Sequence, residues 1–148
     1  MVKKIPLLML FLAISFSYVG CSRTELARIP IQTTGQFDPK FSHPGGELDL
    51  WTDFDIEFSG EATAAYTIAL FKEGDIIETL TCDPFQVEES LMTREVEANG
   101  LQKISFLALM DCVAFLPAGS YSAEVNFSVE GENLKIFRAD LILRQPDN

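Results

Sequence analysis

The chain has 148 residues, with 11 basic and 22 acidic side chains and a formal net charge of −11. Such an acidic chain is repelled by nucleic acid, so we expect no nucleic-acid partner. The length and the 47% hydrophobic content are those of one folded domain with a core of its own.

The first twenty residues have the layout of a secretory signal peptide. Lys3 and Lys4 give a positive start, and an apolar run follows over residues 5–17. This run is shorter than the roughly 20 residues that a membrane-spanning helix needs, and Pro6 near its start suits a cleaved leader. We therefore predict a signal peptide over residues 1–20.

The end of this leader, Tyr18-Val19-Gly20-Cys21, resembles the lipobox of bacterial lipoproteins, in which a small residue precedes a cysteine that becomes lipidated. The resemblance implies cleavage before Cys21 and an acyl (palmitate) anchor in a membrane of the bacterial cell envelope. Tyr18 stands where lipoboxes usually carry leucine. Ser22 stands where an aspartate would retain an enteric-type lipoprotein in the inner membrane, which favours the outer membrane. An ordinary secretory signal with an incidental cysteine is the alternative.

Cleavage would leave a more acidic chain with a pair of cysteines. Of the 148 residues, 128 remain, with nine basic and all 22 acidic side chains, because only Lys3 and Lys4 leave with the leader; the net charge becomes −13. With Cys21 lipidated, Cys82 and Cys112 are left in an oxidising compartment, where a disulfide is expected. Neither a CxxC spacing nor a second histidine points to a redox or metal pair.

The composition predicts a lipidated tether over residues 21–46 and a β domain over residues 47–148. The tether contains Pro30, Pro39, Pro44 and a Gly45-Gly46 pair, although residues 28–32 fit a short edge strand. Period-two alternation of apolar and polar residues then predicts strands over 47–58, 66–71, 76–82, 103–113, 121–129 and 135–144.

Turn residues separate these predicted strands. Lys72-Glu73-Gly74-Asp75 and Glu130-Gly131-Glu132-Asn133 predict hairpin turns. Residues 85–98 are ambiguous, because Asn99-Gly100 can stop a helix or form a type I′ hairpin turn. Since the neighbouring segments are all strands, we favour strand or irregular structure there.

About seven short strands predict an all-β, antiparallel β-sandwich. The turn Pro117-Ala118-Gly119-Ser120-Tyr121 resembles the corner before a late strand of immunoglobulin-like domains. The resemblance implies an immunoglobulin-like sandwich in which the Tyr121 hydroxyl bonds back to the backbone. Ala123 stands where antibody domains have a cysteine, so a Cys82–Cys112 bridge would differ from theirs.

The strand predicted over residues 47–58 carries the candidate binding face. Asp49, Asp53 and Asp55 share one side of it with Trp51. Carboxylates are calcium ligands, and an exposed tryptophan binds sugar rings or protein partners. The alternatives are a solvated acidic face and a tryptophan packed in the fold. We expect no metal site, because residues two apart on a strand lie about 7 Å apart and no calcium-loop motif occurs.

No catalytic constellation accompanies these residues. His43, the only histidine, lies in Ser42-His43-Pro44 without a nucleophile motif, so we expect neither an enzyme nor a cofactor. The sequence thus predicts a lipid-anchored, non-enzymatic envelope protein with a protein partner. The alternatives are a binding module for a small ligand, glycan or calcium, and an inhibitor of a cationic hydrolase such as lysozyme, which the negative charge would attract.

Overall fold

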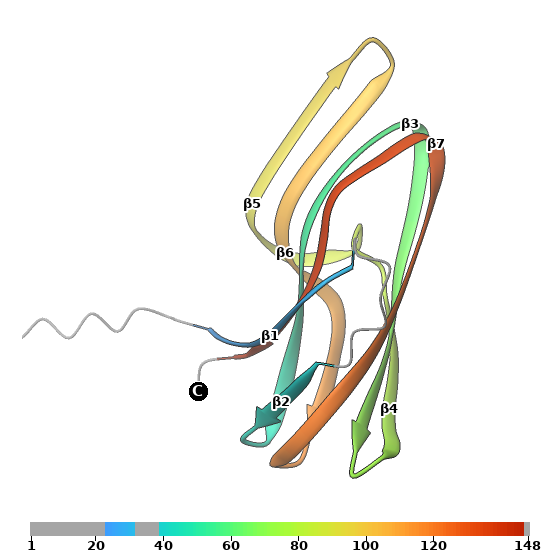
Figure 1. The fold of residues 1–148 in the computed structure, drawn as a ribbon. Coiled ribbons are helices and arrows are strands. Elements are labelled where there is room, and N and C mark those ends of the chain that lie inside the picture. The colour runs from blue at the N-terminus through green and yellow to red at the C-terminus, as the bar shows by residue number, and fades with distance from the viewer. Residues whose placement is uncertain (1–22, 32–38, 147–148) are drawn as a thin grey trace, which may run out of the picture.

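The computed structural model describes residues 23–31 and 39–146, and all regular structure in them is β (Figure 1). The described strands pair antiparallel throughout, which confirms the predicted class. In chain order they are β1 (Thr24–Pro30), β2 (Lys40–His43), β3 (Gly46–Lys72), β4 (Asp75–Cys82), β5 (Val87–Ala98), β6 (Leu101–Leu116) and β7 (Gly119–Gln145). The predicted signal peptide and Cys21 lie outside the described residues.

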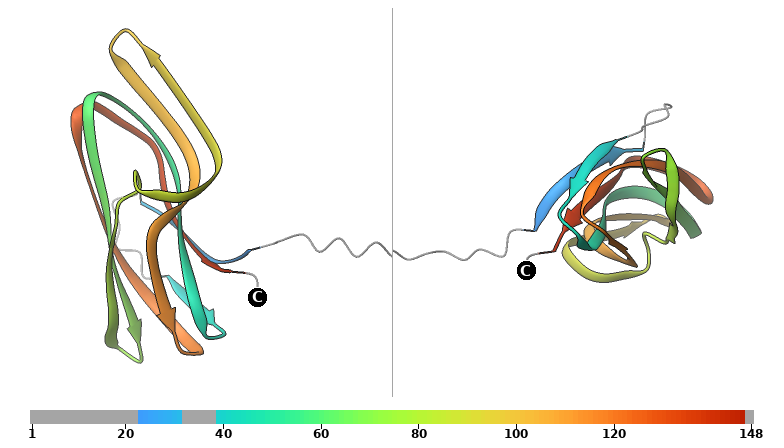
Figure 2. Two further views of the ribbon diagram at one scale, coloured as in Figure 1. Left: turned by 180° about the vertical axis from the view of Figure 1, so that it is seen from behind. Right: turned by 90° about the horizontal axis from the view of Figure 1, so that it is seen from below.

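Strands β3 and β7, each 27 residues long, form the spine of the fold. Their ladder runs from the pair Asp49–Arg144 to the pair Phe71–Ser122. This two-stranded ribbon bends over at one end, so that its two halves lie in facing layers (Figures 1 and 2). One layer has the order β1-β7-β3-β6-β5, and in the other β2 pairs with β7 and β4 with β3. The fold is sandwich-like, with its two longest strands shared by both layers.

The bend lies at residues that the sequence analysis assigned to a hairpin turn, and that assignment is wrong. β7 continues through Gly131 and Asn133, while the register of β3 against β7 shifts between Ser59 and Ala62. Gly60 and Asn133 have positive φ values of 67° and 51°, and the Asn133 side chain donates a hydrogen bond to Ser59 Oγ (2.9 Å). These turn-forming residues bend two paired strands together instead of reversing one of them.

The described part of the predicted tether is a second difference, because it belongs to the sheet. β1 and β2 both pair with β7, and Ile29 and Phe41 are buried in the core. Prolines are tolerated at the ends of edge strands, where no ladder hydrogen bond is lost, so Pro30 does not prevent strand formation. The folded body therefore includes Arg23, two positions after Cys21.

The ambiguous segment forms β5, as the sequence analysis favoured. Asn99 and Gly100 have φ values of 54° and 77°, which a type I′ turn requires, and β6 returns antiparallel to β5. Glu73 and Gly74 form the predicted hairpin turn between β3 and β4 with φ values of 53° and 89°. The predicted hairpin between β3 and β4 is thus confirmed, and of the two alternatives at Asn99-Gly100 the hairpin turn is the one that forms.

The core lies between the two layers, where every second residue of β3 is buried. Phe54 of one layer meets Phe127 of the other with ring centroids 6.1 Å apart. The hydroxyls of Thr52 and Tyr66 lie 2.9 Å apart in this interior. Burial raises the pKa of Tyr66, so the phenol stays neutral and hydrogen-bonded.

The predicted cysteine pair joins the layers. The sulfur atoms of Cys82 and Cys112 lie at disulfide distance, with Cα atoms 5.7 Å apart. Cys82 ends β4 in one layer and Cys112 lies in β6 of the other. The bridge therefore fastens an edge strand of one layer to the opposite layer.

The corner before β7 has the hydrogen bond that the resemblance implied. The Tyr121 hydroxyl donates to the carbonyl of Pro117, and its ring stacks on Phe41 with centroids 5.7 Å apart. Tyr121 is buried, so the hydroxyl has a partner inside the fold.

We expect Tyr121→Phe to lower the free energy of unfolding by about 1–2 kcal/mol, because it removes this hydrogen bond and keeps the ring. Urea unfolding followed by tryptophan fluorescence measures the loss. Ser120→Ala, at an exposed position of the same turn, is the control and should change stability by less than about 0.5 kcal/mol. Equal stability of Tyr121→Phe and the unmodified protein would contradict a structural role of the hydroxyl.

Candidate interaction surface

The predicted binding face lies on the outer side of the layer that contains β5 and β6. Asp49, Trp51, Asp53 and Asp55 are the alternate residues of β3 that point away from the core-facing Phe54. The structure brings all four together, but Asp49 and Trp51 are only 3% and 0% exposed, and Asp53 and Asp55 are partly buried. The face is therefore covered, not open.

Trp51 packs beneath two arginines. The guanidinium carbons of Arg23 and Arg144 each lie 4.8 Å from the centroid of its ring. Arg23 Nε also lies 3.8 Å from the Asp49 carboxylate, and Arg23 Nη2 lies 2.9 Å from Glu89. The packed alternative for Trp51 is confirmed, and an exposed aromatic platform at this position is wrong, because Arg23, which directly precedes β1, and Arg144 of β7 lie over the ring.

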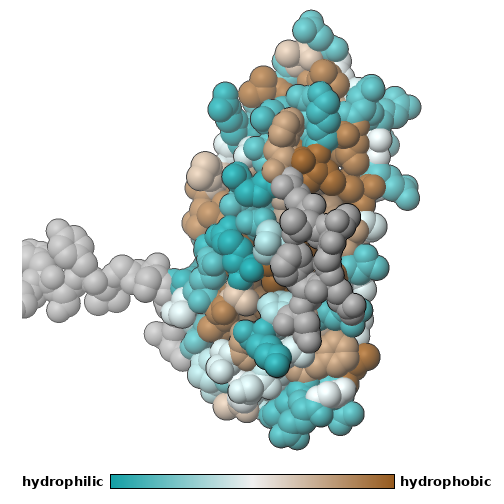
Figure 3. Space-filling view, in the orientation of Figure 1, coloured by the Kyte–Doolittle hydropathy of each residue, from teal (hydrophilic) through white to brown (hydrophobic). Residues whose placement is uncertain are grey.

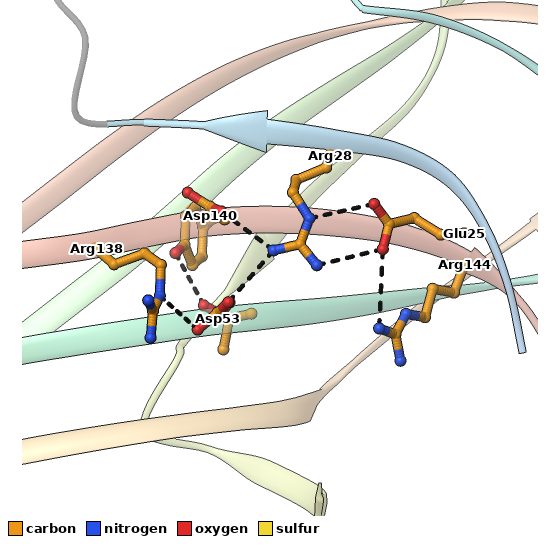
Figure 4. A network of polar contacts seen from close by, with 8 residues as sticks. Glu25, Arg28, Asp53, Arg138, Asp140 and Arg144 are labelled. Carbon is orange, nitrogen blue, oxygen red and sulfur yellow. Dashed lines mark hydrogen bonds and ion pairs between the residues drawn. The ribbon is translucent and has the colours of Figure 1, made fainter. Parts of the chain in front are cut away.

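Asp53 belongs to a network of charges that joins three strands (Figure 4). It accepts hydrogen bonds from Arg138 Nε (2.7 Å) and Arg28 Nη1 (3.3 Å). Arg28 also donates to Asp140 (3.2 Å) and to both carboxylate oxygens of Glu25. The hydrogen bond with Glu25 raises the pKa of Arg28, although partial burial opposes this. The network therefore fixes β1 to β7 and β3.

Asp55 and Glu57, further along the same side of β3, also have cationic partners. Lys103 Nζ lies 3.7 Å from Asp55, and Lys135 Nζ lies 3.1 Å from Glu57. Lysine and arginine thus occupy the positions around these carboxylates where calcium would bind. Within residues 23–31 and 39–146, no group of three or more His, Cys, Asp or Glu side chains is arranged to hold a metal ion. The geometry gives no support to calcium binding by this face.

His43 is buried and performs a local structural task. Its Nδ1 accepts a hydrogen bond from the Gly45 amide (3.0 Å), and its Nε2 lies 3.0 Å from the carbonyl oxygen of Glu47. Since a carbonyl only accepts, Nε2 carries the proton of a neutral imidazole. The ring therefore stabilises the turn between β2 and β3, and both nitrogens are engaged.

The most exposed strand of the described structure is β5. All twelve of its residues are exposed, and they include Val87, Leu91, Met92 and Val96, with exposed fractions of 41–65%. β5 pairs with β6 along one edge only, and its other edge has no strand beside it among the described residues. Figure 1 shows the β5–β6 hairpin projecting past the second layer, and Figure 3 shows hydrophobic and hydrophilic residues intermixed at this end.

A hollow of about 400 Å³ lies beside this strand on the outer face of the sheet. Asp55, Glu57 and Lys103 contribute from β3 and β6, and Arg94 and Val96 contribute from β5. Its walls thus carry both signs of charge together with apolar side chains. Free backbone, exposed apolar residues and a neighbouring hollow make β5 the best candidate for a contact surface.

The residues that cover the β3 face and the exposure of β5 were not predicted from the sequence. Alternating arginines and aspartates near the end of β7, at Arg138, Asp140 and Arg144, were a usable signal. Opposite charges on adjacent strands attract across the sheet, so this pattern matches the acidic face of β3. Arg23 and Arg28 gave no such signal, because their segment was assigned to a tether.

Two comparisons with known proteins gave no match: no protein-family model matches this chain, and no curated protein matches it. No helix among the described residues is long and apolar enough to cross a membrane.

Proposed function

We propose that this protein is a lipid-anchored, non-enzymatic protein of the bacterial cell envelope that acts through protein–protein contacts at β5. The observation that carries the proposal is the free edge of this strand, with twelve exposed residues, four of them large and apolar. Globular proteins usually shorten or cover such edges, because unpaired backbone groups add further strands. A long and uncovered edge therefore supports a partner-binding role.

The position of Arg23 supports a partner close to the membrane. Asp49, Glu89 and the Trp51 ring hold Arg23, which stands two positions after Cys21. Two residues span at most about 7 Å, so a lipid on Cys21 would keep the domain next to the membrane surface. Ser22 after the cysteine favours the outer membrane. The partner would then be a protein of that membrane or of its immediate surroundings.

A capture experiment from solubilised envelope tests the proposal, with the lipidated protein as bait and mass spectrometry as the readout. We expect a stoichiometric protein partner with the unmodified bait. The variant Leu91→Lys/Met92→Lys should recover about tenfold less partner, because two charges enter the apolar contact. Ile76→Lys/Ile77→Lys, at exposed apolar positions on β4, is the matched control and should retain the partner.

Fractionation of the same cells tests the lipid anchor at Cys21. Cys21→Ser should move the protein from the membrane fraction to the soluble fraction. Recovery of no partner above background, or equal recovery with the β5 variant, would contradict a contact function at this edge. A membrane-bound Cys21→Ser variant would contradict the lipid anchor.

A further inference from the structure

We infer that the free edge of β5 binds an extended, cationic segment in which basic and apolar residues alternate, as one more strand of the sheet. The inference rests on the proposed function and specifies the chemistry of the partner. It follows from the register of β5, from its unpaired carboxylates and from the total charge.

The regular half of β5 presents two chemically different faces. From Met92 to Ala98, every residue pairs in register with β6, whereas the earlier half of the strand is interrupted by two bulges. Met92, Arg94 and Val96 lie on the outer face, where Arg94 and Val96 line the hollow, and Glu95 and Glu97 lie on the opposite face. Because successive side chains of a strand point to opposite faces, an added strand would meet these two rows alternately.

Glu95 and Glu97 differ from the acidic residues in the middle of β3. Asp53, Asp55 and Glu57 on β3 each pair with arginine or lysine. Within the described part of the chain, no ion pair or side-chain hydrogen bond engages Glu95 or Glu97. Their charges are therefore available to a partner, and opposite charges placed across adjacent strands stabilise the pairing.

The charge balance favours a foreign strand over a second copy of the chain. β5 carries four glutamates and one arginine, a net charge of −3, on a chain whose net charge after cleavage is −13. Pairing two copies would bring these like charges together, which is unfavourable. A basic strand neutralises them. The two bulges limit pairing to the regular segment and so reduce indiscriminate strand addition.

A peptide titration tests the inference directly. The probe is a fluorescent peptide of about nine residues in which lysine and valine alternate, which is the length of an ordinary strand. A peptide of the same composition with all lysines before all valines tests the alternation, and a glutamate–valine peptide tests the charge. We expect the alternating lysine peptide to bind at least about tenfold more tightly than either control. Hydrogen exchange should show protection of β5 amides on binding.

Charge reversal locates the binding site. Glu95→Lys/Glu97→Lys should weaken binding of the alternating peptide by about tenfold, through loss of attraction and gain of repulsion. Glu124→Lys/Glu130→Lys on β7, also exposed, makes the same change in net charge and should weaken it by less than about threefold. Both variants change exposed side chains, and their melting temperatures verify that they are folded.

Five results would overturn the inference. Equal weakening by both variants would mean general electrostatic attraction, and equal binding of the block peptide would exclude strand addition. Absence of peptide binding would exclude a cationic strand. A concentration-dependent dimer that Glu95→Lys/Glu97→Lys alters would assign the edge to a second copy. If the envelope partner is captured equally by this variant, the proposed function stands and only the inference fails.

Discussion

Replacing Trp51 with alanine is expected to lower the free energy of unfolding by about 3–5 kcal/mol. The ring is fully buried and lies under the guanidinium groups of Arg23 and Arg144. Its removal leaves a cavity between β1, β3 and β7 and takes the aromatic contact from two cations. Thermal and urea unfolding followed by circular dichroism measure the loss, since Trp51 is the only tryptophan of the chain.

Trp51→Phe distinguishes the contribution of the aromatic ring to stability from that of the indole nitrogen. The indole N–H has no hydrogen-bond partner among the described residues, so the substitution loses no hydrogen bond and retains an aromatic face. We expect it to cost less than half as much as alanine, although phenylalanine binds cations more weakly than tryptophan. A loss below about 1 kcal/mol for Trp51→Ala would contradict the packing role, because full burial implies more.

Removal of the Cys82–Cys112 bridge is expected to lower the free energy of unfolding by about 3–4 kcal/mol. The two cysteines are 30 residues apart, and closing a loop of that length restricts the unfolded chain. The bridge also joins β4 to the opposite layer. Cys82→Ser/Cys112→Ser should therefore unfold at a lower urea concentration than the oxidised protein.

Unfolding of the reduced, unmodified protein tests the same bridge without a substitution. Because Cys82 is buried, the reductant is added during equilibration in denaturant, where the chain opens. Reduction should lower the transition midpoint of the unmodified protein and leave that of the double serine variant unchanged. An unchanged midpoint of the unmodified protein would show that the bridge is absent in solution.

The strands that alternate strictly were predictable from the sequence, and so was the cysteine pair. Residues 47–58 follow period two because one side of β3 faces the core, and the Asn99-Gly100 turn has the residue types that positive φ demands. The corner at Tyr121 was identified from the five residues 117–121, since its hydrogen bond is local. Local chemistry determines all of these features.

The bend and the cover of the β3 face were not predictable in the same way. Gly131 and Asn133 have the chemistry of a reversing turn, and only the pairing of β7 with β3 across the whole ribbon makes them a bend. Likewise Trp51 looks like a surface residue of a polar strand until Arg23 and Arg144 reach it from distant segments. The bend and the burial of Trp51 both depend on pairing between distant segments. The apolar periodicity of one strand does not show which distant segment will pair with it.

The shared spine has a consequence for the order in which the chain folds. β3 starts at Gly46, but its partner β7 starts only at Gly119 and ends at Gln145, so the central ladder cannot be completed until residues up to 144 have been synthesised. β1 also pairs with β7, so it cannot join the sheet before β7 is present. Such distant pairings fold slowly, and unpaired strands aggregate while they wait. During synthesis from the N-terminus, β1, β2 and β3 therefore each keep an unpaired edge until β7 has been made. β7 then pairs with all three strands and completes both layers.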